Sequence, residues 1–253
     1  MPLALSDFYR EHLAVLHRQL LASPITRTYF TGTGIRLDGV ELMPGDQFEL
    51  PVGTFSTIEF AHLFSVVDGS RVHQQIAKEP AQDAPPGLYF TVVNTRIIQS
   101  PHKNRLGIYT DQRGAADLFI DGLHIDRYFL NEQRTPPTLG TIAFALCAIT
   151  AHLAGLAQVS LVAAGGRGFD SRYVGYKVWP KLGFDAPLEP GEIAQVPHLA
   201  HCHSVQDVLA VDAAWWEDQG SQRLMTFDLA ARSTSWQKLL AYVGRKLSDG
   251  RLP

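Results

Sequence analysis

The chain has 253 residues, of which 45% are hydrophobic and 19% are charged, and its formal net charge is -3 with every histidine neutral. These values are typical of a globular protein that has one large domain, or one domain with an appendage, and they exclude collagen-like and low-complexity chains. A chain with so small a net charge and no basic run has no electrostatic field for nucleic acid, so we expect no nucleic-acid partner.

The N-terminal residues do not show a basic segment followed by an apolar core, so we expect no secretory signal and a cytoplasmic protein. Cys147 and Cys202 are too few to form a disulfide framework. The stretch 139–157 is nearly all apolar, but its uninterrupted apolar runs are shorter than the roughly 20 residues that a membrane span needs. We therefore expect a helix buried inside the protein and no membrane span.

Hydrophobic periodicity predicts a helix over residues 1–22, with Ser6 as its cap. Short β-type runs broken by glycines follow over 24–51, and 57–67 is predicted to be a short helix. The polar, proline-rich segment 78–86 has the composition of a linker, so we place a boundary there.

Three strands are predicted next, over 88–98, 105–110 and 117–130, the last of them interrupted at Asp121 and Gly122. Short polar turns between consecutive strands favour an antiparallel meander. The apolar segment 139–155 then predicts a helix that ends at its C-terminal glycine.

The remaining chain predicts a buried strand over 158–164 and a short helix over 176–181. It then predicts a helix over 205–216, a strand over 224–229 and a helix over 235–247. The order of these elements gives an α/β (α+β) fold class, with a mixed, mostly antiparallel sheet flanked by helices.

The joint between the strand 117–130 and the helix 139–155 has the features of an anion site. A helix N-terminus presents unpaired N–H groups and a partial positive charge, which favour phosphate oxygens. Gly140 lies in the first helical turn, where a missing Cβ would let a pyrophosphate approach the backbone. Thr138 and Thr141 add hydroxyl donors, and Arg134 adds a charge. The alternative is a capped helix with no ligand.

A second motif follows the buried strand, in the sequence Gly175-Tyr-Lys-Val-Trp-Pro-Lys-Leu-Gly-Phe-Asp185. It resembles the signature of GNAT-type N-acyltransferases, in which an aromatic residue, two further residues and Leu precede a Gly-Phe turn. The order of elements over 88–188 is also similar to that family. The resemblance makes residues 85–190 the core, with an N-terminal extension over 1–84 and a C-terminal extension over 191–253.

The resemblance implies an acyltransferase that moves an acyl group from acetyl-CoA or another acyl-CoA to an amine. The pantetheine arm of the acyl-CoA would lie between the strands 117–130 and 158–164, which would splay apart. The acceptor amine, on a small molecule or a protein, would attack the thioester. The residues that the resemblance assigns to the pyrophosphate are Arg134, Thr138, Leu139, Gly140 and Thr141.

The sequence departs from the family pattern at two places. In the pyrophosphate loop only Gly140 is kept, Thr138 stands at the position of the first glycine, and the two prolines at 136 and 137 remove backbone donors. At the position of the general acid the chain has Trp179, which has no proton to give at neutral pH. Tyr176 and Tyr173 are the available acids, although Tyr176 and Trp179 are also spaced as packing aromatics.

For a general base, the strand 117–130 offers His124 and Asp126, which lie two residues apart and so share one face. An aspartate beside a histidine orients the imidazole and stabilises its charged form. An exposed polar face of a half-buried strand is the alternative explanation.

Three other interpretations remain open. A catalytically inactive binding protein on the same scaffold would explain the broken glycine loop. An ADP-ribosyltransferase would use Arg27 or Arg36 and a Ser-Thr pair, but no Glu/Gln-x-Glu motif follows Thr57. The metal-capable cluster of four residues just before the helix 205–216 lacks the two separated ligand pairs of zinc sites, so we expect a polar loop and no metal. Its members are His198, His201, Cys202 and His203.

Overall fold

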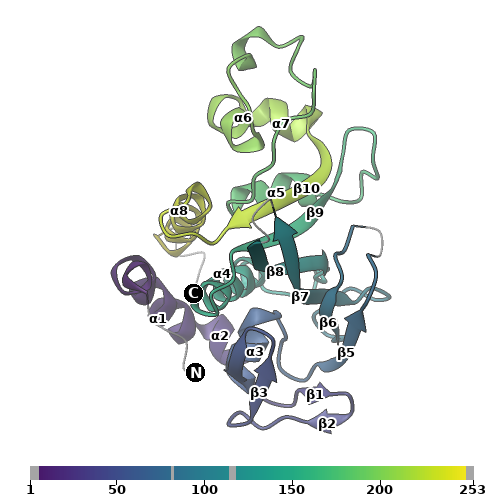
Figure 1. Ribbon diagram of the computed structural model, residues 1–253, viewed down its shortest axis with the longest axis vertical. Coiled ribbons are helices and arrows are strands. Elements are labelled where there is room, and N and C mark those ends of the chain that lie inside the picture. The colour runs from purple at the N-terminus through teal and green to yellow at the C-terminus, as the bar shows by residue number, and fades with distance from the viewer. Residues whose placement is uncertain (1–5, 81–82, 114–117, 249–253) are drawn as a thin grey trace.

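The computed structural model describes residues 6–80, 83–113 and 118–248 of the chain. Those residues form one mixed, mostly antiparallel eight-stranded sheet, a two-stranded sheet and a set of flanking helices (Figure 1). This arrangement confirms the predicted α+β class. No helix within the described ranges is long and apolar enough to cross a bilayer.

The helical elements are η1 (Tyr9–Leu13), α1 (Ala14–Ala22), α2 (Pro24–Tyr29), α3 (Thr57–Leu63), α4 (Leu139–Leu153), α5 (Gly175–Lys181), η2 (Pro197–Leu199), α6 (Val205–Val211), α7 (Ala213–Gln219) and α8 (Thr234–Ser248). The strands are β1 (Arg36–Leu37), β2 (Val40–Glu41), β3 (Gln47–Leu50), β4 (Gly53–Ser56), β5 (Arg71–Ala77), β6 (Gly87–Val93), β7 (Asn104–Arg113), β8 (Leu118–Arg127), β9 (Gln158–Gly166) and β10 (Ser221–Asp228).

The large sheet has the strand order β10-β9-β8-β7-β6-β5-β1-β2. Its neighbours pair in antiparallel fashion except β8 with β9 and β1 with β5, which are parallel. The sheet takes strands from all three sequence segments, because β5 pairs with β6 across the predicted boundary at residue 84 and β10 pairs with β9 across that at residue 190. The segments are therefore joined by continuous backbone hydrogen bonding.

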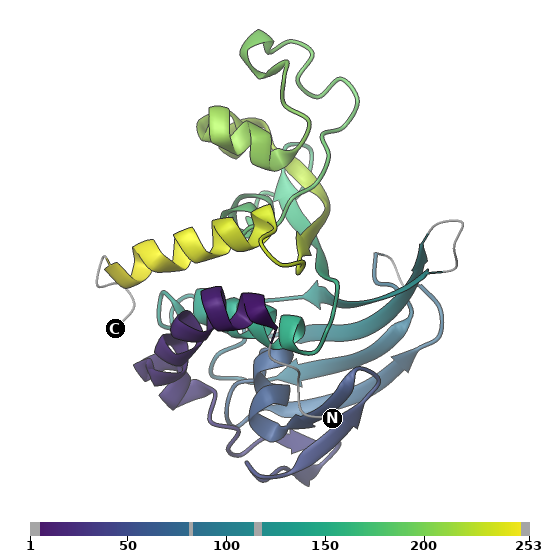
Figure 2. The ribbon, with the colours of Figure 1, turned by 60° about the vertical axis from the view of Figure 1, so that its left-hand side comes forward.

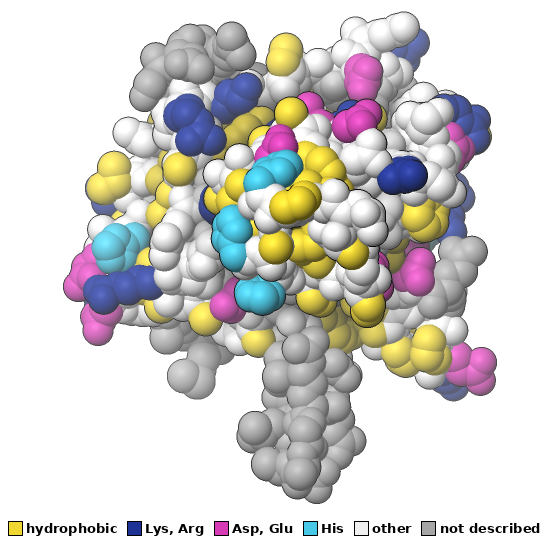
Figure 3. Space-filling model, turned by 90° about the horizontal axis from the view of Figure 1, so that it is seen from above, with side chains coloured by type: hydrophobic (Ala, Val, Ile, Leu, Met, Phe, Trp, Pro, Cys, Tyr) yellow, Lys and Arg dark blue, Asp and Glu magenta, His cyan; other side chains and the backbone are white. Residues whose placement is uncertain are grey.

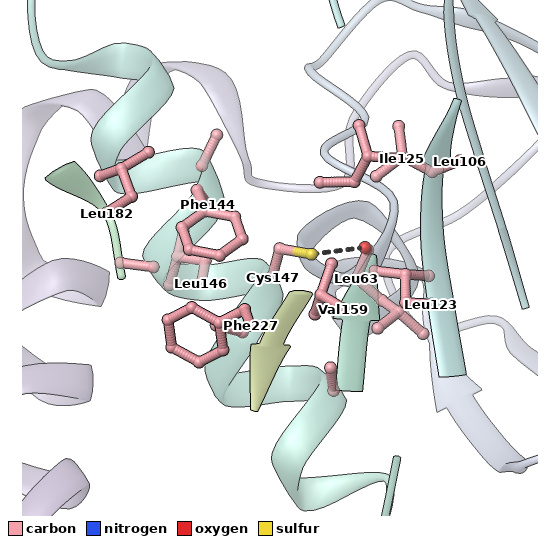
Figure 4. Close-up of a cluster of buried hydrophobic side chains, with 14 of the residues drawn as sticks. Leu63, Leu106, Leu123, Ile125, Phe144, Leu146, Cys147, Val159, Leu182 and Phe227 are labelled. Atoms are coloured by element: carbon pink, nitrogen blue, oxygen red, sulfur yellow. Dashed lines mark hydrogen bonds between the residues drawn. The ribbon is translucent and has the colours of Figure 1, made fainter. Parts of the chain in front are cut away.

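Helices α1, α2, α3 and α8 gather around α4 on one side of the large sheet (Figure 2). Most of α4 is buried, in agreement with the prediction of a fully enclosed helix over 139–155. The thiol of Cys147 donates a hydrogen bond to the carbonyl oxygen of Leu63 in α3, at 3.1 Å (Figure 4). Burial raises the pKa of this thiol to about 12, so it stays neutral inside the core.

Local sequence explains where the predicted elements hold and where they do not. Ser6 accepts from the N–H of Tyr9 and begins the first helix as predicted. The predicted β-type segment 24–51 is wrong at its start, because Ser23 caps α2 and Pro24 occupies its first turn. The predicted helix 205–216 is two helices, since the backbone N–H of Asp212 donates to Val208 at the end of the first and its side chain accepts from the N–H of Trp215 at the start of the second.

Strand β8 is continuous through Gly122, where an interruption was predicted. The ring of Tyr109 on the neighbouring strand lies against Gly122, so close that a Cβ there would be 2.7 Å from the ring. Tyr89 covers Gly107 in the same way, at 2.4 Å. These glycines therefore serve cross-strand packing on the sheet and do not break the strand.

Candidate functional site

The candidate site lies where β8 and β9 stop pairing with each other. Their parallel ladder runs from Gly122 opposite Gln158 to Ile125 opposite Leu161. Beyond that point β8 continues to Arg127 and β9 continues to Gly166, but neither bonds to the other. We call this diverging region, residues 126–130 and 162–166, the β8–β9 opening. Helix α4 connects the two strands and begins at the same end of the sheet (Figure 1).

Aromatic side chains pack beside the β8–β9 opening. The ring of Trp179, from α5, meets those of Tyr128 and Phe144 edge to face, with centroids 5.8 and 5.9 Å apart. Phe129 stacks on His102 at 4.0 Å, and its backbone N–H donates to the side chain of Asn104 at 2.6 Å. Trp179 thus packs against the opening at the position where the resemblance expects a general acid.

The start of α4 presents two N–H groups that have no acceptor among the described residues. Leu139 donates to the carbonyl of Pro136 and Ile142 donates to that of Thr138, each at 3.0 Å, which leaves the N–H groups of Gly140 and Thr141 between them. Thr138 makes no side-chain cap. Thr138 and Leu139 are buried, whereas Gly140 and Thr141 are half-buried. The two free donors therefore lie on the accessible part of the helix start.

Arg134 lies close to this helix start, in the turn that precedes it. The turn is held by Asn131, whose carbonyl oxygen accepts from the N–H of Arg134 at 3.0 Å and from that of Thr135 at 2.9 Å. The exposed Arg134 guanidinium donates to the carbonyl of Thr95 at 3.3 Å. No carboxylate within the described ranges forms an ion pair with it. Its charge is therefore not neutralised by an acidic side chain of the described residues, and its side-chain hydrogen bond is to the loop that follows β6.

His124 is enclosed on the outer face of the sheet, opposite α4, one register pair before the last pair of β8 and β9, Ile125 with Leu161. Its Nδ1 lies 2.9 Å from the hydroxyl of Ser160, its partner in β9. The hydroxyl of Ser160 donates to Tyr109 at 3.3 Å, so we assign the Nδ1 hydrogen to His124 as donor to Ser160. Burial lowers the pKa of His124 to about 4, which keeps the ring neutral with a lone pair on Nε2.

Asp126 shares the outer face with His124, as predicted, but its carboxylate binds elsewhere. Arg105 donates to it at 2.9 Å, and Arg127 lies 3.7 Å away. Arg105 also lies over the ring of Tyr89, 3.9 Å from its centroid. The partner of His124 is therefore Ser160, and Asp126 acts on the histidine only through space, where its charge opposes the effect of burial on the pKa.

The two candidate acids lie in different surroundings. The hydroxyl of Tyr176 donates to the backbone carbonyl of Glu217 at 3.0 Å, and its side chain is buried between α5 and α7. Tyr173 is half-buried, and its ring lies 6.2 Å from that of Phe129 at the end of β8. The geometry thus ties Tyr176 to the packing of α7, and of the two candidate acids only Tyr173 lies beside the β8–β9 opening.

Sequence analysis did not identify the residues that surround His124. Gln158 donates to the hydroxyl of Tyr109 at 2.7 Å, which joins β7, β8 and β9 in one polar network with Ser160. A signal was present, because Gln158 and Ser160 are polar at alternate positions of an otherwise apolar strand. Tyr109 carries no such signal, since only the register between β7 and β8 brings it to the network.

The segment that contains His198, His201, Cys202 and His203 precedes α6, in the lobe that carries α6 and α7. Figure 3 shows His side chains beside hydrophobic and acidic ones at this end of the molecule. His198 pairs with Asp212 at 3.0 Å, and Cys202 is buried. No group of three or more metal-binding side chains occurs among the residues that the structure describes. His201 and His203 are exposed.

The residues of the ADP-ribosyltransferase interpretation lie on separate elements. Arg27 is exposed on α2, and Arg36 is exposed on β1. Ser56 ends β4, and its hydroxyl forms the capping box of α3 with Glu59, so it serves the helix start.

No family model, no curated protein and no solved structure matches this chain.

Proposed function

We propose that the protein is an N-acyltransferase that moves an acyl group from acetyl-CoA or a related acyl-CoA to an amine. The observation that carries the proposal is the β8–α4–β9 unit. Two parallel strands separate after Ile125 and Leu161, and the helix between them begins at the same end with two unpaired N–H groups. This combination offers an extended substrate both an unpaired strand edge and an anion seat.

The residues at the start of α4 fit a pyrophosphate. The N–H groups of Gly140 and Thr141 and the guanidinium of Arg134 are donors without an acidic partner in the described chain. A Cβ at residue 140 would lie 3.1 Å from the side chain of Leu130, so glycine here lets Leu130 pack against the first turn of α4, and the fit to an anion rests on the two N–H groups. The substrate thioester supplies the activated acyl group, and the protein supplies position and proton acceptors.

His124 is the proposed proton acceptor for the amine. Its Nδ1 is held by Ser160, which leaves Nε2 as the basic nitrogen. With a pKa of about 4 the ring is unprotonated at neutral pH but only weakly basic, so in this proposal the amine enters in its neutral form and His124 takes its proton only as the nitrogen bonds to the thioester carbonyl and becomes more acidic. Tyr173 is the proposed donor to the leaving thiolate, because Tyr176 is bonded to α7.

The acceptor class in this proposal is an amine on a small molecule or a protein. The proposal also places the protein in the cytoplasm, which agrees with two free, buried cysteines.

The test is calorimetric titration with acetyl-CoA, with NAD as a second ligand in the same buffer. We expect micromolar binding of acetyl-CoA that is lost in Gly140→Trp. Gly244→Trp is the matched control, because Gly244 lies in α8 and a Cβ there meets nothing within 4 Å. Equal binding by wild type and Gly140→Trp would refute the pyrophosphate seat, and binding of NAD alone would favour the ADP-ribosyltransferase.

A second candidate function is a binding protein with no acyl transfer. Two observations favour it: Trp179 packs against Tyr128 beside the β8–β9 opening, and the prolines at 136 and 137 have no N–H to offer an anion. It predicts no heat of binding with acetyl-CoA. If the wild type does not bind acetyl-CoA but Trp179→Ala does, the packed ring of Trp179 closes the opening.

A further inference from the structure

A separate cavity lies at the far edge of the large sheet, on strands β1 and β5. Its volume is about 290 Å³, and it is lined by Arg36, Gly39, Arg71, Val72 and His73. Strands β5, β6 and β7 separate β1 from β8, so at about 4.8 Å per strand the cavity is roughly 19 Å from the β8–β9 opening. It is therefore independent of the proposed acyl transfer.

Two arginines face each other in this cavity. Arg36 and Arg71 are register partners on the parallel strands β1 and β5. His73 follows Arg71 by two residues and so projects from the same face of β5. Like charges directly opposite each other on neighbouring strands repel, and they destabilise the sheet unless something of opposite charge lies between them.

The described acidic residues offset these charges only in part. Glu41 lies 3.5 Å from Arg36, and Asp38 lies 3.4 Å from His73, but all four side chains are at least half exposed. Exposed pairs of this kind contribute little. Arg71 has no carboxylate partner within the described ranges, and no acidic residue lines the cavity. The cavity therefore holds an excess of positive charge.

The turn between β1 and β2 keeps the cavity open. Asp38 and Gly39 both have positive φ, at 48° and 88°, as a two-residue hairpin turn of type I′ requires. A Cβ at residue 39 would meet nothing within 4 Å, so the rim beside Arg36 is unobstructed. The backbone N–H of Asp38 donates to the carbonyl of Val72, which fixes the turn against β5.

We propose that this cavity binds an oxyanion of the phosphate class between Arg36 and Arg71. Paired guanidinium groups match the geometry of phosphate oxygens and form charge-assisted hydrogen bonds to them. The anion is either free phosphate or the phosphate group of a small ester. The competing explanation is that the charges only guard the edge of the sheet against pairing with other chains, which requires no ligand.

The experiment measures calorimetric binding of inorganic phosphate and of phenyl phosphate, and thermal unfolding in phosphate against chloride at equal ionic strength. We expect both probes to bind the wild type and phosphate to raise its unfolding temperature. Arg71→Gln and Arg36→Gln should each weaken binding at least about tenfold. Arg18→Gln, which removes an exposed charge from α1, should bind as the wild type does.

The variant Arg134→Gln distinguishes phosphate binding in this cavity from phosphate binding at the start of α4, which is the other potential anion site. Loss of binding in Arg134→Gln with full binding in Arg71→Gln would place the anion at α4 and overturn the proposal, as would equal unfolding temperatures in phosphate and chloride. Arg71→Gln should be at least as stable as the wild type in chloride, because the repulsion is removed. Tighter binding of phenyl phosphate than of inorganic phosphate would identify an ester as the ligand, and equal binding would identify the free anion.

Discussion

Leu123 and Val159 are opposite each other on β8 and β9, and the next register pair along the same strands is His124 with Ser160. All four side chains are almost completely buried. The first pair lies under α4 in the apolar core (Figure 4), whereas the second lies on the outer face in a network with Tyr109. On the helix side, buried side chains stabilise the protein through their apolar contact area. On the outer face, buried polar groups are tolerated only because each one has a hydrogen-bond partner.

The largest loss of stability is expected from a substitution in the apolar core between α4 and the sheet. Phe144 in α4 packs against Trp179, Phe184 and Phe227. Phe144→Ala should lower the free energy of unfolding by about 3–5 kcal/mol, because it leaves a cavity that rigid neighbours cannot fill. Phe144→Leu is the control and should cost less than half as much. Urea unfolding midpoints measure both, and equal losses would contradict a well-packed cluster.

Acid should weaken both sides, through one histidine on each. Burial lowers the pKa of His62, in the helix layer, and of His124, on the outer face, from 6.5 to about 4. As the pH falls, the unfolded chain therefore takes up protons before the folded chain does. The contribution of the two neutral histidines to the free energy of unfolding is fully present above pH 6.5 and is lost as the pH drops from 6.5 to about 4. Each histidine accounts for up to about 3 kcal/mol of that loss.

The two histidines differ in their partners, which gives the measurement that separates them. Nε2 of His62 is buried without a hydrogen-bond partner among the described residues, whereas His124 is bonded to Ser160. His62→Leu should flatten the dependence of the urea midpoint on pH between 7 and 4 and leave the stability at pH 7 nearly unchanged. A variant with the wild-type slope would show that His62 is not neutral in the folded protein.

The packing of tyrosine over glycine is specific to the outer face. A Cβ at Gly107 would lie 2.4 Å from the ring of Tyr89, so Gly107→Ala must displace the ring and with it the Arg105 that lies over it. We expect a loss of about 1–3 kcal/mol from overpacking. In Tyr89→Ala the methyl group has room, so the second change should then have almost no further effect. Additive losses in this double-mutant cycle would contradict the contact.

The two sides also differ in how far sequence predicts them. The helix over 139–155 was predicted within two residues of α4, because an apolar segment with a glycine at its end specifies its own structure. Helix α2 was missed because its cap at Ser23 is local chemistry without hydrophobic periodicity. The face shared by His124 and Asp126 followed from alternation along β8. The partners of these two side chains could not be predicted from alternation, because Ser160 lies on β9 and Arg105 on β7, and only the register of those strands with β8 brings them into contact.

The smallest effect is expected from removing one hydroxyl group of the outer-face network. Ser160→Ala removes the acceptor of the Nδ1 hydrogen of His124 and the donor to Tyr109, and it should lower the free energy of unfolding by about 1 kcal/mol. Val159→Ala, one residue earlier on the helix side, is the matched control and should lose about twice as much through lost apolar contact. If the proposed acyl transfer is correct, Ser160→Ala should also lower kcat while KM for acetyl-CoA stays constant, because only the orientation of the base changes. An unchanged kcat in an active enzyme would remove His124 from the proposed chemistry and leave it as a structural member of the outer face.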